Sequence, residues 1–148
     1  MNSTLSIAVT SATFYDFGPV NSGSTAVQAT PFAIQNNGGG LTETLSLSAA
    51  NSANWTLKST AGAPGANQFA LDALFSTAIP LVGDYVDTTD RLSLVSTAAD
   101  GTKFANTQTG VSIAFNASVN LYTKLNAPST SASSAPQKIV VTITASNP

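Results

Sequence analysis

Hydrophobic and polar residues alternate with a period of two along most of this chain. Leu5, Ile7 and Val9 alternate with small or polar residues, which is the pattern of a strand with one buried face. Residues 138–144 are rich in β-branched side chains and have high strand propensity. Between these two ends, further strands are predicted at residues 25–35, 41–49, 55–57, 69–75, 91–96 and 111–121.

Turn-forming residues separate these segments. The Asn and Gly residues at 36–40 accept the positive φ of a tight hairpin, so we expect 25–35 and 41–49 to be joined by one. Pro31 interrupts the first of these strands and marks an edge or a bulge. Residues 127–136, rich in Ser, Ala and Pro, are linker-like. About eight or nine strands at this spacing, without a convincing helical segment, predict an all-β, immunoglobulin-like two-sheet β-sandwich.

The length of 148 residues fits a single β-sandwich domain over residues 1–148. A chain of this size buries roughly 70% of the surface that it exposes when unfolded, so its core needs no disulfide or metal. Residues 1–10 are a candidate for an N-terminal strand that is exchanged between copies.

Histidine and cysteine are both absent. The chain therefore lacks the side chain that titrates near neutral pH, the commonest nitrogen ligand of transition metals, and any thiolate. Serine and threonine are plentiful, but a hydroxyl nucleophile needs a base, which is usually histidine. One Glu and six Asp residues offer little for paired-carboxylate chemistry, and Glu43 lies at a mid-strand position that we expect to face solvent. We expect no enzymatic activity and no cofactor.

Charged residues make up only 8% of the chain, against a usual share of about 25%, and the formal net charge is −2. The polar remainder is Ser, Thr, Asn and Gly, which predicts a neutral surface without the basic footprint of a nucleic-acid-binding protein. No apolar run approaches the ~20 residues of a transmembrane helix, so no membrane insertion is expected. Residues 1–5 do not resemble a signal peptide, so we expect an exported form to have lost its signal.

Acidic residues gather after residue 83, at Asp84, Asp87 and Asp90. Oxygen-rich loops can hold Ca²⁺, but this spacing lacks the alternate-residue pattern of an EF-hand loop. The alternative is a solvated loop in which Asp87 or Asp90 caps a turn or pairs with Arg91. We favour this second interpretation, without a bound metal.

Two aromatic residues bear on a carbohydrate-binding role. Trp55 alternates with Leu57 inside a predicted strand, so we expect it in the core, whereas Tyr85 in the acidic loop is expected at the surface. Sequons for N-glycosylation, which matter only where exported proteins are glycosylated, occur at Asn2, Asn54 and Asn116.

The predicted strands carry few charges at their edges. Soluble β proteins guard such edges with Lys, Glu, bulges or Pro. Here the outward positions are Thr, Ser, Asn and Ala, and we expect inward-pointing charges to be nearly absent, so copies of the chain can pack closely. A terminal strand added to a neighbour's open sheet edge would join them, although pairing within one subunit is the alternative for either terminus. The candidate inter-subunit strand residues are Leu5, Ile7 and Val9 at one end and Ile139, Val141 and Ile143 at the other.

Three segments carry a resemblance to a known class of proteins. They are residues 54–57 (Asn-Trp-Thr-Leu), 68–71 (Gln-Phe-Ala-Leu) and 137–145 (Gln-Lys-Ile-Val-Val-Thr-Ile-Thr-Ala), which cover under half of the chain. With them the sequence resembles the Thr/Ser/Ala/Asn-rich Ig-like domains of bacterial and archaeal cell-surface proteins and pilus-like filament subunits. The resemblance implies a cell-surface or filament role, sometimes with donated strands, and transfers no catalytic or ligand-binding residue.

We therefore expect an extracellular or cell-surface structural subunit that forms a homo-polymer, a filament or lattice, with strand donation as its joint. Two alternatives stay open. One is a monomeric adhesive module that binds carbohydrate or a host surface, and the other is a viral or phage decoration protein.

Overall fold

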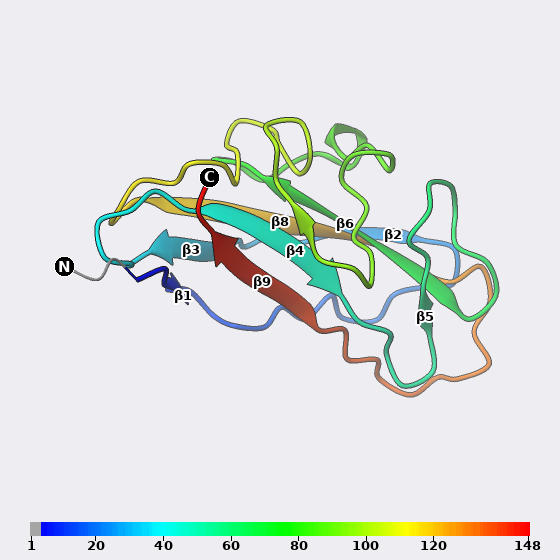
Figure 1. The fold of residues 1–148 in the computed structure, drawn as a ribbon. Coiled ribbons are helices and arrows are strands. Elements are labelled where there is room, and N and C mark those ends of the chain that lie inside the picture. The colour runs from blue at the N-terminus through cyan, green and yellow to red at the C-terminus, as the bar shows by residue number, and fades with distance from the viewer. Residues whose placement is uncertain (1–3) are drawn as a thin grey trace.

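The computed structural model describes residues 4–148, which form nine strands in two sheets (Figure 1). Within these residues the one helical element is a single 3-10 turn, η1 (Val82–Asp84), so the all-β prediction is confirmed. The larger sheet consists of β1 (Ile7–Val9), β2 (Thr25–Val27), β3 (Phe32–Asn36), β5 (Thr56–Leu57), β6 (Gln68–Phe75) and β8 (Ser118–Asn126). The smaller sheet consists of β4 (Thr44–Ala49), β7 (Thr97–Ala98) and β9 (Val141–Ser146).

The larger sheet has the order β1-β3-β8-β6-β5, and β2 also pairs with β8. All its pairs are antiparallel except β5 with β6. The smaller sheet has the order β7-β4-β9 and lies across the larger one (Figure 1). β1 and β9 are therefore edge strands of different sheets.

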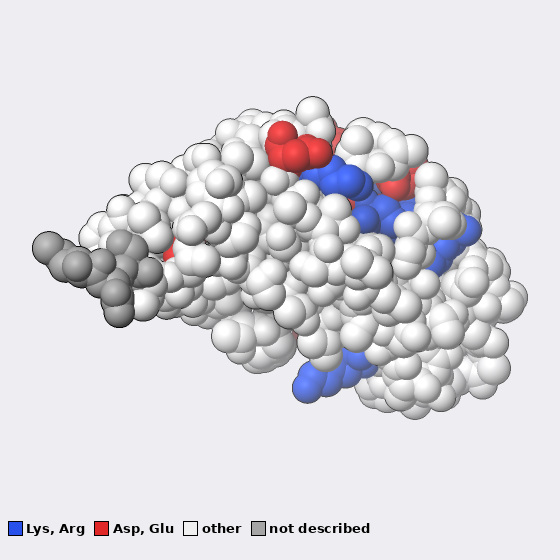
Figure 2. Space-filling model, in the orientation of Figure 1, with Lys and Arg blue, Asp and Glu red and all other residues white. Residues whose placement is uncertain are grey.

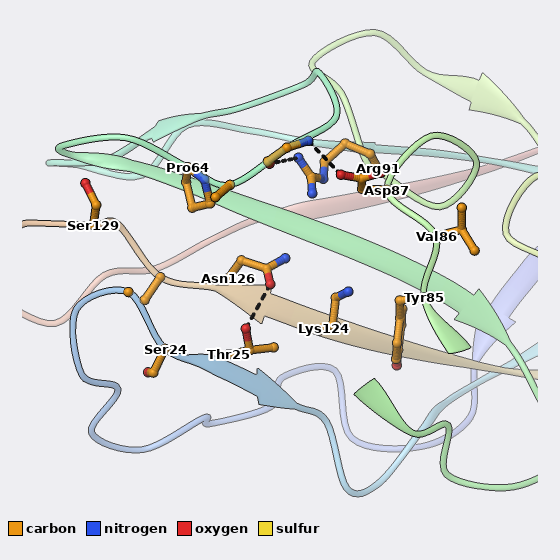
Figure 3. A pocket seen from close by; sticks show the side chains of 14 residues that line it. Ser24, Thr25, Pro64, Tyr85, Val86, Asp87, Arg91, Lys124, Asn126 and Ser129 are labelled. Carbon is orange, nitrogen blue, oxygen red and sulfur yellow. Dashed lines mark hydrogen bonds between the residues drawn. The ribbon is translucent and has the colours of Figure 1, made fainter. Parts of the chain in front are cut away.

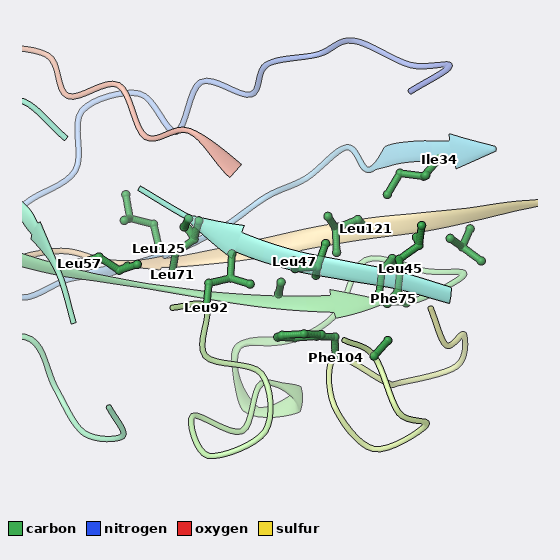
Figure 4. Close-up of a cluster of buried hydrophobic side chains, with 14 of the residues drawn as sticks. Ile34, Leu45, Leu47, Leu57, Leu71, Phe75, Leu92, Phe104, Leu121 and Leu125 are labelled. Carbon is green, nitrogen blue, oxygen red and sulfur yellow. The ribbon is translucent and has the colours of Figure 1, made fainter. Parts of the chain in front are cut away.

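The core lies between the two sheets (Figure 4). Leu45 and Leu47 of β4 point toward the larger sheet, where they meet inward side chains of β3, β6 and β8. Alternate residues of each strand supply this layer, as the period of two requires. Fully buried members are Ile34, Leu45, Leu47, Phe69, Ala73, Phe75, Leu92, Phe104 and Leu121.

Strand β6 is buried on both faces, with seven of its eight residues buried. On the edge that faces away from β8, the short strand β5 pairs only with Gln68 and Phe69, and irregular segments cover the rest. The Leu92 N–H donates to the Leu71 carbonyl, and the Phe75 N–H donates to the Phe104 carbonyl. Residues 82–107 thus protect this edge and also bury polar side chains on the outer face of β6.

One hairpin prediction and two strand predictions are wrong. The turn at 36–40 is no hairpin, because β3 and β4 belong to different sheets and the turn carries the chain between them. Residues 91–96 form a single bridge at Arg91 instead of a strand, since they bond to the edge of β6 only locally. The strand predicted at 111–121 begins at Ser118, because Ser112 and Asn116 adopt positive φ angles of 51° and 63°.

Candidate functional site

A groove with a volume of about 1610 Å³ opens between the edges of the two sheets. One wall is formed by residues 13–22, and the other by residues 131–141 and the side chain of Ile143 in β9. Its floor includes the core residues Leu71 and Leu125, and the only charged residues in its described lining are Asp16 and Lys138. An apolar groove beside two sheet edges is suited to main-chain pairing with apolar side chains inserted alternately.

The edge strand β9 borders this groove and is paired on one side only. Its partner is β4, over six residue pairs from Thr44↔Ser146 to Ala49↔Val141. The Ala50 N–H donates to the Val140 carbonyl, so the even-numbered residues of β9 bond to β4. The N–H and C=O groups of Val141, Ile143 and Ala145 therefore point to the free edge, while their side chains are only half-buried. Ile139, the remaining C-terminal candidate, lies just before the strand and packs against the core.

The N-terminal candidates lie at the edge of the larger sheet. β1 pairs with β3 in the register Ile7↔Asn36, Ala8↔Gln35 and Val9↔Ile34. Ile7 packs against the core, but Val9 remains 37% exposed, and Leu5, just before the strand, is 41% exposed. Both termini thus pair within their own chain, and β1 is the more weakly covered of the two.

A buried carboxyl group holds the start of this strand. The Ser6 N–H donates to Oε1 of Glu43 at 2.6 Å, and the Gly39 N–H donates to the Thr4 carbonyl at 2.7 Å. A Cβ at Gly38 would lie 2.6 Å from both the Thr4 carbonyl oxygen and Glu43 Oε1, so only glycine admits the backbone here. We call Gly38, Gly39 and Glu43 the strand seat.

Glu43 is fully buried, so its predicted position toward solvent is wrong. The sequence holds the signal that would have found it: Glu43 has the same parity as Leu45 and Leu47, which fill the core. A β-bridge to Ile113 fixes its backbone, while Oε2 has no hydrogen-bond partner within the described part of the chain.

Residues 4–20, which we call the N-terminal arm, combine β1 with an irregular stretch along the groove. After Thr10, two hydrogen bonds connect the arm to the larger sheet and its approach: the Ala33 N–H donates to Ser11 Oγ, and the Ala29 N–H donates to the Tyr15 hydroxyl. Phe17 packs against the core, and its ring meets that of Tyr15 edge-on at 4.9 Å. Phe14 is 77% exposed. After Thr10 the arm therefore makes few hydrogen bonds to its own sandwich, although Phe17 and Val20 anchor it to the core.

A second polar centre lies on the outer face of β6. Asp72 is fully buried and accepts hydrogen bonds from Arg91 Nε and, at 3.0 Å, from Asn126 Nδ2. Lys124 Nζ lies 3.2 Å from Asp72 Oδ2 and 5.1 Å from the centre of the Tyr85 ring. Inward-pointing charges are thus present, contrary to expectation, and Arg91 pairs with Asp72 rather than with Asp87 or Asp90. Compensation within the cluster explains how these charges are tolerated.

A pocket of about 590 Å³ lies beside this cluster (Figure 3). Tyr85 lines it but is 6% exposed, so its predicted surface position is wrong. Burial, reinforced by the charge of Asp72, raises the pKa of its hydroxyl, which has no partner among the described residues. Trp55 lies elsewhere, half-buried in the groove, where its Nε1 donates to Ser131 Oγ at 2.9 Å. The two aromatic residues therefore do not form one sugar platform.

The three acidic candidates for Ca²⁺ each accept a hydrogen bond from a main-chain N–H. Asp84 accepts from the Leu81 N–H, Asp87 from the Gly62 N–H and Asp90 from the Val86 N–H. Within residues 4–148 no group of three or more acidic residues is arranged to hold a metal ion.

Two of the sequon residues, Asn54 and Asn116, are exposed to solvent. Asn2 lies outside the described residues. Helices long and apolar enough to cross a bilayer do not occur between residues 4 and 148. The chain matches no protein-family model, and neither a curated protein nor a solved structure is detectably similar to it.

Proposed function

We propose that this protein is an extracellular structural subunit that assembles with copies of itself into a surface filament or lattice by adding strands at open sheet edges. One observation carries the proposal: β9, the longest edge strand, has a free hydrogen-bonding edge beside an apolar groove. The other strands that are paired on one side only, β1, β2, β5 and β7, have three residues or fewer.

The charge distribution supports contact between copies. Figure 2 shows most of the blue and red atoms gathered in one band in the upper part of the visible face, with a separate blue group at its lower edge, while most of that face carries no charge. Strand β9 contains no Lys, Glu or Pro that would protect its edge. A neutral surface of this kind gives little repulsion between molecules that approach edge to edge.

We also assign the sandwich to the immunoglobulin-like class. The crossing from β3 to β4 between sheets, followed by the pairing of β4 with the distant β9, supports this assignment.

Negative-stain microscopy and light scattering of the concentrated protein test the proposed assembly. Regular filaments or sheets with a repeat the size of one domain are expected. A particle that remains a monomer over the whole accessible concentration range would overturn the proposal.

A further inference from the structure

We propose that the N-terminal arm is exchanged between copies, so that residues 4–20 of one molecule take the place of the same residues in the next, at the strand seat and along one wall of the groove. This inference rests on the proposed function and adds a second contact between copies, in which the donated segment is the arm and the acceptor is the strand seat rather than the free edge of β9.

The strand seat recognises main chain and not side chains. The bonds that hold the arm come from the N–H of Ser6 and the carbonyls of Thr4 and Ser6, which meet Glu43 Oε1, the Gly39 N–H and the Asn37 N–H. The missing side chain of Gly38 lets this backbone approach. Such a site fits the backbone of an extended peptide. The segment that binds there, residues 4–6, is present in every copy of the chain.

An empty seat is unfavourable. Glu43 is fully buried and one of its two oxygens already has no partner, so removing Ser6 would leave the whole buried carboxyl group without a donor. Asn36, also buried, ends β3 directly beside the seat. The seat therefore requires an arm at all times, but the arm of a second copy makes the same contacts as the chain's own.

The arm is attached loosely enough to exchange. Ile7, Phe17 and Val20 pack against the core, but β1 forms three residue pairs where β9 forms six. Leu5, Val9 and Phe14 expose large parts of their side chains, and two hydrogen bonds hold the stretch after Thr10. The groove beside the arm is open toward β9. An arm of this length spans roughly 50 Å when extended, which is enough to reach an adjacent domain.

The hinge is the tight turn that follows the arm. The Ser24 N–H donates to the Asn21 carbonyl, and Gly23 has a φ of 72°. Opening this turn breaks the hydrogen bonds between Ser24 and the Asn21 carbonyl, whereas β2 begins at Thr25 and stays paired with β8. Each copy would then give its arm to one neighbour and receive an arm from another, which is a head-to-tail contact that extends into a filament unless it closes as a ring.

The C-terminal strand is a poor candidate for the same exchange. β9 forms six residue pairs with β4, and Val141, Ile143 and Ala145 pack against the core. Its departure would uncover Leu45 and Leu47. We therefore assign the donated segment to the N-terminus and leave β9 in place.

Disulfide trapping tests the exchange, because the chain contains no cysteine of its own. Ala8 and Gln35 face each other across β1 and β3 on the outer face, where paired residues lie about 5.5 Å apart between Cα atoms and a disulfide fits. Ala8→Cys protein and Gln35→Cys protein are mixed, refolded together, concentrated and oxidised. Peptide mass spectrometry is expected to find the 8–35 disulfide between molecules in clear excess over the 8–142 disulfide of a control mixture of Ala8→Cys with Thr142→Cys. Equal yields would overturn the exchange.

The double variant Ala8→Cys/Gln35→Cys gives a second readout. Oxidised in dilute solution, each chain locks its own arm, and assembly is expected to be lost and to return on reduction. If the locked protein assembles as well as the reduced one, arm exchange is wrong while the proposed assembly stands. If wild-type protein does not assemble under any condition, the proposed function itself fails.

Discussion

The main-chain N–H of Ser6 donates a 2.6 Å hydrogen bond to the buried side chain of Glu43, thirty-seven positions away. This contact links the start of β1, at the edge of the larger sheet, to the residue just before β4 of the smaller sheet. We expect Glu43→Ala to lower the free energy of unfolding by about 1–3 kcal/mol, because it removes the acceptor of a buried hydrogen bond. Glu43→Gln keeps an oxygen at the same place and is expected to lose less. Chemical denaturation checks both, and an Ala variant as stable as the wild type would contradict the assigned role of the bond.

Gly38 should not tolerate a methyl group. A Cβ there would lie 2.6 Å from the carbonyl oxygen of Thr4 and from Glu43 Oε1, both of which are held by hydrogen bonds. We expect Gly38→Ala to cost about 1–3 kcal/mol and to speed hydrogen exchange at the Ser6 amide. The matched control is Gly83→Ala, where a Cβ meets nothing within 4 Å, with an expected change within about 0.5 kcal/mol. Equal effects of the two substitutions would contradict the geometry of the seat.

The alternation of side chains predicts strand faces well because it depends only on neighbouring residues. Leu45, Leu47, Val119 and Leu121 are buried as their parity requires. The same alternation does not say which sheet a strand joins. For this reason the Asn/Gly turn at 36–40 predicts a hairpin from the sequence, although it carries the chain between sheets.

The buried polar residues were harder to predict, since their partners are distant in sequence. Asp72 has the polar parity of a surface residue in β6, and only the fold brings Arg91 and Lys124 to it. Glu43 differs, because its parity alone places it with the core leucines. The general tendency of charged residues to face solvent predicts the opposite position, which is wrong here. Tyr85 is hard to predict for the same reason as Asp72, since its burial depends on packing over Lys124 of the same cluster.

Removing the negative charge of Asp72 should lower the stability of the folded protein. Asp72→Asn keeps the shape of the side chain but leaves the neighbouring cations Arg91 and Lys124, each only 8% exposed, without their counter-charge. We expect a loss of about 3–5 kcal/mol in unfolding free energy. The control Asp16→Asn lies on the exposed arm and should change stability by about 0.5 kcal/mol or less. Urea denaturation of both variants at neutral pH measures the difference, and a similar loss in each would argue against the cluster.

Asp90 should make stability depend on pH. Burial raises the pKa of its carboxyl group above the ordinary value of 3.8, in opposition to hydrogen bonds from Val86 and Thr89. The folded protein therefore holds this proton more tightly than the unfolded chain, so the group stabilises below pH 3.8 and loses that contribution as pH rises through its raised pKa. Relative to Asp90→Asn, the wild type should lose unfolding free energy between pH 3 and neutrality. A difference that stays constant or grows with pH would show that burial does not dominate.

The free edge of β9 can be blocked without disturbing its pairing with β4. Because Ala145 directs its N–H away from β4, Ala145→Pro removes a donor that only an added strand would use. Ala145→Ser keeps that donor and is the matched control. If copies join at this edge, the Pro variant should fold but assemble less than the Ser variant, as followed by light scattering at equal concentration. Circular dichroism verifies that both variants retain their sheets. Equal assembly by two folded variants would remove the β9 edge from the joint, and the whole contact would then have to come from the exchanged arm.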